Sequence, residues 1–107
     1  MIQNIDKINP IKRSMVKKSA EIAAQCSDIE KVVVFGSSVR DDCRSDSDVD
    51  FCFYRSPNRD NRTFVDALKK ICIACDYLVD TLESDVLSPS FTKIVNETGV
   101  VVYDRLS

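Results

Sequence analysis

The sequence predicts an α/β fold, in which helices and strands alternate along the chain and pack in layers. Apolar residues at three- and four-residue spacing mark the helices, and short continuous apolar runs mark buried strands. Proline and glycine positions mark where helices begin and end. The resulting order is helix, strand, strand, helix, strand, helix, strand, with no internal repeat. With 107 residues, 44% of them hydrophobic and 30% charged, we expect one soluble domain over residues 1–107.

The first helix is expected to begin at Asn9 and Pro10, since Asn is a good N-cap and Pro fits the first helical position. Lys12 belongs to a set of basic residues interpreted as a solvated face, with a binding patch for phosphates or an acidic partner as the alternative. The remaining members of that set are Arg13, Lys17 and Lys18, and the apolar stripe comprises Ile11, Met15, Ser19, Ile22, Ala23 and Cys26.

The run from Val32 to Phe35 is continuously apolar, which predicts a strand buried on both faces. Gly36 follows at its end, where the missing Cβ lets the backbone approach a ligand closely. If a short helix begins at Ser37, its free N–H groups and the Ser37 hydroxyl can hold a phosphate. This turn is therefore a candidate phosphate-binding element.

Two aspartates open the next apolar strand. Asp48 and Asp50 are two residues apart, so on a strand both carboxylates lie on one face, while Phe51 and Phe53 lie on the other. Neighbouring carboxylates repel each other, and the usual reason for keeping them together is a hard divalent cation that both ligate. Asp48 and Asp50 are therefore candidate metal ligands.

Together these features resemble the signature of the minimal nucleotidyltransferases of the DNA polymerase β superfamily. The resemblance rests on Gly36-Ser37, ten intervening residues, Asp48-Val49-Asp50 and a following apolar strand. Arg40 and Ser47 also stand where the family often has Arg and Ser. Two positions depart from it, because Ser38 and Asp41 replace the Arg and the Gly that are common there.

The resemblance implies a fold and a third carboxylate. The implied fold is a small mixed β-sheet with helices packed on one face and the carboxylates on the other. The family adds the third carboxylate from a later strand, which we expect over residues 76–80. Asp76, at the start of that strand, is the expected residue, and Asp80 is the alternative.

A reaction is also implied, in which a nucleoside monophosphate, most simply AMP from ATP, passes to an acceptor hydroxyl. In the implied two-metal site, Asp48 and Asp50 bind one Mg²⁺ and share a second with Asp76, which also helps to take the acceptor's proton. Gly36 and Ser37 bind the β and γ phosphates, so that pyrophosphate can leave in line.

Stand-alone proteins of this size resemble the antitoxins of toxin–antitoxin pairs. The resemblance implies a HEPN-domain RNase toxin as the protein partner, modified with AMP, often on a tyrosine. Two alternatives stay open: a non-catalytic module that blocks the toxin by contact alone, and a nucleotidyltransferase that acts on a small molecule. A pure binder has no need for Asp48 and Asp50 together, so the presence of this pair favours an enzyme over a non-catalytic binding module.

The later elements follow the same signals. A helix capped by Asp60 or Asn61 is expected to end near Ala74, and another begins at Ser88-Pro89. Its end at Gly99 precedes a last strand over residues 100–103. The apolar stripes of the two helices are Phe64, Leu68, Ile71, Cys72 and Cys75, and then Phe91, Ile94 and Val95.

Charge and cysteine content restrict the possible binding partners and the cellular compartment of the protein. A net charge of −2 gives no basic field for nucleic acid, and no apolar run is long enough to span a membrane. Five cysteines without an export signal predict reduced thiols in a cytoplasm. Cys72 and Cys75 form a C-x-x-C pair, but the chain has no histidine and no second pair to complete a zinc site. Core packing is thus favoured over a zinc or redox role.

Overall fold

The structure is a computed structural model that describes residues 1–106. It contains a four-stranded sheet with the strand order β3-β2-β1-β4. β1 pairs antiparallel with both β2 and β4, whereas β2 and β3 run parallel, so the sheet is mixed, as predicted. The strands are β1 (Ile29–Phe35), β2 (Val49–Arg55), β3 (Val79–Glu83) and β4 (Val100–Asp104).

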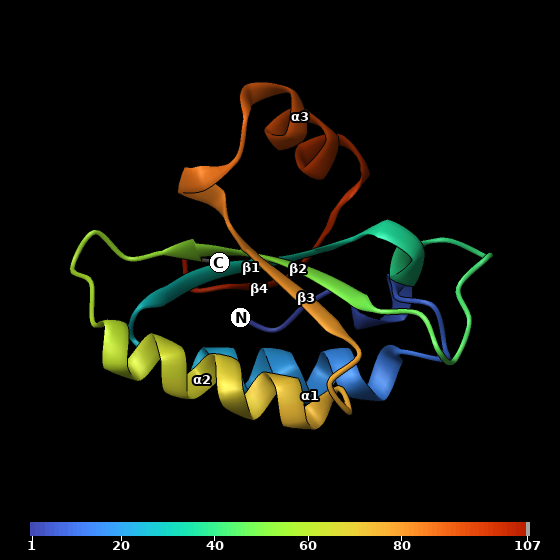
Figure 1. Cartoon of the computed structure of the whole chain (residues 1–107), viewed down its shortest axis with the longest axis horizontal. Helices are drawn as coiled ribbons and strands as arrows, with labels where there is room; N and C mark the ends of the chain where they lie inside the picture. The colour runs from blue at the N-terminus through green and yellow to red at the C-terminus, as the bar shows by residue number, and fades with distance from the viewer. Residues whose placement is uncertain (107) are drawn as a thin grey trace.

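Helices cover both faces of this sheet. α1 (Arg13–Ala24) and α2 (Asn61–Ala74) lie side by side on one face, and α3 (Pro89–Thr98) lies on the other (Figure 1). The larger core fills the space between the sheet and the first two helices. Its fully buried members include Val16, Ala20, Val34, Phe51, Phe53, Phe64 and Ile71. A smaller core under α3 consists of Val33, Phe35, Cys52 and Val95.

The position of α3 corrects the expectation that all helices share one face. Successive side chains of a strand point to opposite faces, so Val32 and Val34 enter the larger core while Val33 and Phe35 face α3. A strand that is apolar at every position needs cover on both sides, and α3 supplies the second cover. As a consequence, α3 borders the face on which the predicted carboxylates lie.

The chain before α1 differs from the prediction, because α1 begins at Arg13 and not at Pro10. Asn9 instead contacts the loop after β1: its backbone N–H donates to the Ser38 carbonyl (2.8 Å) and its side-chain amide donates to the Arg40 carbonyl (2.8 Å). These two bonds tie the start of the chain to the loop that joins β1 and β2.

Lys12 corrects the prediction of a solvated basic face. Its side chain is fully buried, and Nζ donates a hydrogen bond to the Ser45 carbonyl at 3.0 Å. Lys12 lies just before the helix, so helical spacing does not set the direction of its side chain. Burying an ammonium group is costly unless it is hydrogen-bonded. The hydrogen bond from Lys12 to Ser45 also attaches the β1–β2 loop to the start of α1 at a second point.

The other helix ends follow the sequence signals. The side chains of Asp60 and Ser88 each accept a hydrogen bond from a backbone N–H three residues later, at 3.2 Å, as N-caps do. α2 ends at Ala74, and α3 starts at Pro89 and is followed by Gly99 as its C-cap. None of the helices in residues 1–106 is both long and apolar enough to cross a membrane.

A buried ion pair closes the end of the sheet remote from the aspartates. Arg55 donates two hydrogen bonds to Asp28, both at 2.8 Å, and a third to Glu83 at 3.0 Å. These bonds hold the pKa of the Asp28 carboxyl below its usual value. The Arg55 guanidinium also lies 4.0 Å from the centre of the Phe64 ring. Removing one partner of such a buried pair typically costs about 3–5 kcal/mol, so this contact anchors β1, β2 and β3 together.

The C-x-x-C pair divides into one core residue and one half-buried residue. Cys75 is fully buried and its Sγ lies 3.4 Å from the Ser19 hydroxyl, whereas Cys72 keeps partial exposure. All five cysteines are free thiols. Core packing is confirmed for Cys75 and holds only in part for Cys72.

This difference predicts a difference in stability. Cys75→Ala should lower the free energy of unfolding by about 1–3 kcal/mol, because it leaves a cavity in the larger core. Cys72→Ala should cost less, since solvent already reaches that side chain. Urea unfolding of both variants measures this, and metal analysis of the purified protein should find no stoichiometric zinc. One zinc per chain, or equal losses in the two variants, would contradict the packing role.

Candidate active site

The glycine turn after β1 is built around a close contact with β2. Gly36 opens a short 3₁₀ helix over Gly36–Val39, and its φ of +74° is in the left-handed region that favours glycine. A Cβ at this position would lie 2.2 Å from the Asp50 Oδ2 atom. The short helix predicted at Ser37 is thus present as a 3₁₀ helix that begins one residue earlier. The Asp50 carboxylate lies so close to Gly36 that no larger residue would fit there.

Asp48 and Asp50 lie at the start of β2. Asp48 immediately precedes the strand and is exposed, while Asp50 is its second residue and is half-buried. The side chains that flank Asp50 in sequence, Val49 and Phe51, are both in the larger core. Asp50 therefore points to the opposite face, away from α1 and α2, as the two-residue spacing predicted.

The pairing of the strands places a third carboxylate beside Asp50. In the register of the sheet, Asp50 is opposite Phe35 of β1 on one side and opposite Asp80 of β3 on the other. Burial raises the pKa of the Asp50 carboxyl, and the negative charges of Asp80 and Asp48 raise it further. Asp48, Asp50 and Asp80 thus form one electrostatically coupled group, which we call the carboxylate row.

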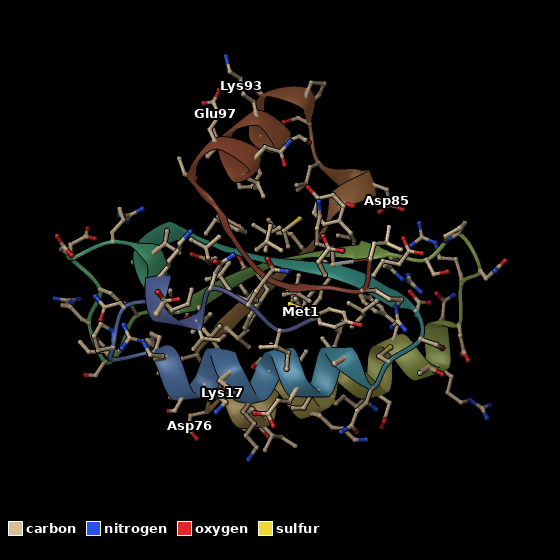
Figure 2. The ribbon with its side chains drawn as sticks, turned by 180° about the vertical axis from the view of Figure 1, so that it is seen from behind. Met1, Lys17, Asp76, Asp85, Lys93 and Glu97 are labelled. Carbon is tan, nitrogen blue, oxygen red and sulfur yellow. The ribbon has the colours of Figure 1, made fainter. Side chains whose placement is uncertain are left out.

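Asp76 does not join this row. It lies in the turn between α2 and β3 with a φ of 53°, and its backbone N–H donates to the Ile73 carbonyl at 3.1 Å. Figure 2 shows Asp76 on the side of the molecule that carries α1, remote from α3. The strand predicted over residues 76–80 begins only at Val79, because Asp76 and Tyr77 both adopt left-handed backbone angles. The geometry favours the alternative residue, Asp80, as the third carboxylate.

The carboxylate row has the chemistry that suits Mg²⁺. Carboxylate oxygens are the hard ligands this ion prefers, and burial together with the charges of Asp80 and Asp48 raises the pKa of Asp50, so a cation beside it would be favourable. Within residues 1–106, no three acidic, cysteine or histidine side chains are already gathered closely enough to coordinate an ion. Asp48 and Asp80 are exposed, so their side chains can rotate towards an ion at little cost. The donor set fits the metal.

The loop from Arg40 to Ser47 runs past the carboxylate row. Arg40 pairs with Asp42 at 3.0 Å, and both side chains are more than half exposed, so the pair contributes little stability. The positive charge of Arg40 partly offsets the rise in the pKa of Asp50, which places it near that carboxylate. Asn9 and Lys12 hold this loop in place through hydrogen bonds to the Arg40 and Ser45 carbonyls. Arg40 is therefore free to exchange Asp42 for a phosphate near the carboxylate row.

A mixed sheet with a glycine turn after one central strand and an Asp-x-Asp motif at the start of its neighbour has the arrangement of a nucleotidyltransferase fold. The profile of the family described as polymerase beta, nucleotidyltransferase, matches residues 17–107. The chain belongs to this family. A comparison with curated proteins gives no match.

Solved structures share the fold at low sequence identity. A chain of a toxin–antitoxin complex with AMP-PNP is 18% identical over 82% of this chain and 73% of that one, with a TM-score of 0.65. A tri-AMPylated HEPN toxin complex with its MNT antitoxin from Shewanella oneidensis includes a chain that is 19% identical, covering 84% and 70%, with a TM-score of 0.62. A protein assigned as a minimal nucleotidyltransferase is 21% identical, covering 78% and 87%, with a TM-score of 0.64.

Proposed function

We propose that this protein transfers AMP from ATP to a hydroxyl group, in a reaction that depends on Mg²⁺. The observation that carries the proposal is the carboxylate row beside the Gly36 turn, in a chain of the nucleotidyltransferase family. The similar complexes, one with AMP-PNP and one with a tri-AMPylated toxin, support ATP as the donor and a protein as the acceptor.

Each part of the site has a role in this transfer. Asp48, Asp50 and Asp80 would hold Mg²⁺, which neutralises charge on the triphosphate when it is bound. The backbone N–H groups of the turn at Gly36 and the Ser37 hydroxyl bind the terminal phosphates and orient pyrophosphate as the leaving group.

The bond changes follow from this placement. The acceptor oxygen forms a bond to the α-phosphorus, and the bond from that phosphorus to the pyrophosphate oxygen breaks. The Asp80 carboxylate, beside Asp50 on the same face of the sheet, accepts the proton that the hydroxyl loses. Asp76 is given no role in this proposal, because it lies in the turn between α2 and β3 and is not paired with Asp50 in the sheet.

We further propose that the acceptor belongs to a HEPN-domain toxin and that the protein acts as its antitoxin. The similarity to antitoxin complexes supports this partner, and AMP on the toxin in one of them supports a covalent mode of action. The acceptor hydroxyl then comes from outside this chain, which agrees with the exposed position of Asp48 and Asp80.

Thermal unfolding tests the metal and nucleotide site directly. Mg²⁺ and ATP at about a hundred times Kd should stabilise the wild-type protein by ~2.7 kcal/mol, because they bind only the folded state. Asp48→Asn should remove most of that response without unfolding the protein, since Asp48 is exposed.

Asp46→Asn is the matched control, because Asp46 is an exposed residue of the same loop and its carboxylate pairs with Arg44. It should keep the full response to Mg²⁺ and ATP. If Asp48→Asn responds as strongly as the wild type, Asp48 is not a metal ligand.

A further inference from the structure

One edge of the sheet is covered and the other is open. Residues 1–4 run along β4: the Gln3 N–H donates to the Val102 carbonyl at 2.9 Å, and Ile2 forms an isolated bridge with Tyr103. In the part of the chain that the structure describes, β3 pairs with β2 alone. The unpaired backbone groups of an edge strand readily pair with another chain. The outer edge of β3 is therefore a candidate docking site.

The backbone groups at this open edge belong to alternate residues of β3. The Leu78 carbonyl accepts a hydrogen bond from the Val49 N–H of β2 at 2.9 Å. Successive residues of a strand direct their backbone groups to opposite sides. The N–H and carbonyl groups that point away from β2 are therefore those of Val79, Thr81 and Glu83.

A pocket lies on each face of this edge. On the α3 face, a pocket of about 400 Å³ has Asp80 and Leu82 of β3 in its wall. On the α2 face, a groove of about 470 Å³ includes Thr81 of β3, and we call it the α2 groove. Ile73, also in its wall, is 61% exposed, and gathered exposed apolar side chains mark interaction sites. The other residues that line the α2 groove are Val65, Leu68, Lys69, Cys72 and Tyr77.

We propose that the acceptor hydroxyl is presented on an extended segment of the acceptor protein, which joins the sheet as an added strand beside β3. This inference rests on the proposed function and adds to it the form in which the acceptor binds. Side chains of an added strand alternate between the two faces of the sheet. A residue beside Asp80 therefore lies on the face of the carboxylate row, and its neighbours in sequence lie on the face of the α2 groove.

The two faces define the chemistry of this segment. Side chains of paired residues on neighbouring strands have Cβ atoms about 4.5–5.5 Å apart. A hydroxyl on the residue beside Asp80 is thus close to the carboxylate that accepts its proton. The residues before and after it should be apolar, because the α2 groove is mainly apolar. The expected pattern is a hydroxyl residue between two apolar residues.

The charge of this edge disfavours a second copy of the chain as the occupant. Two copies paired through β3 would bring another Asp80 carboxylate to the place where Asp48, Asp50 and Asp80 already lie together. Like charges on neighbouring strands destabilise their pairing. A segment that is neutral or basic beside Asp80 meets no such repulsion.

The test separates the backbone hydrogen bond of Thr81 from its side chain. Thr81→Pro removes an N–H that points outwards, whereas Thr81→Ala shortens the side chain and keeps this N–H. Kinetics of AMP transfer to a candidate HEPN toxin give the KM for the toxin and kcat. Thr81→Pro should raise KM roughly five- to tenfold, as expected for one lost hydrogen bond, and Thr81→Ala should change it less than about twofold. Both should keep kcat within about twofold, because the carboxylate row is unchanged.

The α2 groove is tested in the same assay. Ile73→Gln should raise KM roughly fivefold through lost apolar contact, and it keeps the test valid if Thr81→Pro disturbs β3. Ile11→Gln is the matched control and should leave KM unchanged, because Ile11 is 49% exposed and lines neither pocket. The variants should keep the stabilisation by Mg²⁺ and ATP, which shows that the fold and the donor site are intact. In the wild type, bound toxin should slow hydrogen exchange of the Thr81 N–H, because the added strand accepts its hydrogen bond.

The outcomes separate this inference from the proposed function. If the wild-type protein transfers no AMP to the toxin, the proposed acceptor itself fails. If the wild type transfers AMP but the Thr81 N–H exchanges equally fast with and without toxin, the toxin binds elsewhere and the added strand is wrong. Equal changes of KM in Thr81→Pro and Thr81→Ala, or in Ile73→Gln and Ile11→Gln, would also overturn the inference.

Discussion

Asp80→Asn should lower the rate of AMP transfer by roughly 10²–10⁴-fold, the range for loss of a general base. The side chain keeps its size but can neither accept the acceptor's proton nor supply a negative charge to the metal. Asp80 is exposed on an edge strand, so the substitution should leave the fold intact. It also removes one of the charges that raise the pKa of Asp50.

Asp76→Asn is the matched comparison, because the sequence predicted for Asp76 the role that is proposed here for Asp80. Asp76 lies in the turn after α2, outside the carboxylate row, so its substitution should leave the transfer rate within about twofold of wild type. Pyrophosphate release from ATP, in the presence of Mg²⁺ and a candidate HEPN toxin, measures both. A large loss in Asp76→Asn with an unchanged Asp80→Asn would overturn the assignment.

The local part of the site could be predicted from the sequence because short segments determine it. Gly36 and Ser37 belong to one turn, and Asp48 and Asp50 to the first residues of one strand. The alternation of a strand alone is enough to place Asp50 opposite the core residues Val49 and Phe51. No knowledge of distant contacts is required for these predictions.

The third carboxylate could not be predicted in the same way, because its position depends on how two strands pair. The register between β2 and β3 brings Asp80 to Asp50, and two left-handed residues after α2 delay the start of β3. Left-handed angles at Asp76 and Tyr77 are uncommon for residues other than glycine, so the sequence gives little sign of them.

Lys12 and Arg55 show a second limit of sequence reasoning. Both are basic residues that ordinarily face solvent, and the structure buries both. Their partners, the Ser45 carbonyl and the Asp28 carboxylate, are remote in sequence, 33 and 27 residues away. Such contacts form only once the sheet and its loops have assembled, so spacing along the chain does not reveal them.

The double substitution Asp48→Asn with Asp50→Asn should abolish AMP transfer while the protein stays folded. Asn nearly preserves the volume of Asp, and the opposite face of β2 is packed in the larger core. Burial and neighbouring negative charges raise the pKa of Asp50, which means that its charged form is disfavoured in the folded state. Removing that charge should therefore preserve the stability of the protein or increase it. The loss of transfer should amount to orders of magnitude, because the groups that hold Mg²⁺ are gone.

The same double variant separates an enzyme from a protein that neutralises a toxin by contact alone. It is expressed together with a candidate HEPN toxin, the mass of the toxin is measured for added AMP, and growth is scored. A variant in which Asp46→Asn is combined with Asp66→Asn is the control, because it removes two exposed carboxylates, each paired with an exposed basic residue, and leaves the carboxylate row and Arg40 intact. For an enzyme, the Asp48 and Asp50 variant should lose both the added mass and the protection, and the control should keep both. Full protection by a variant that no longer modifies the toxin would show that binding is sufficient and that the carboxylate row is not the basis of the antitoxin effect.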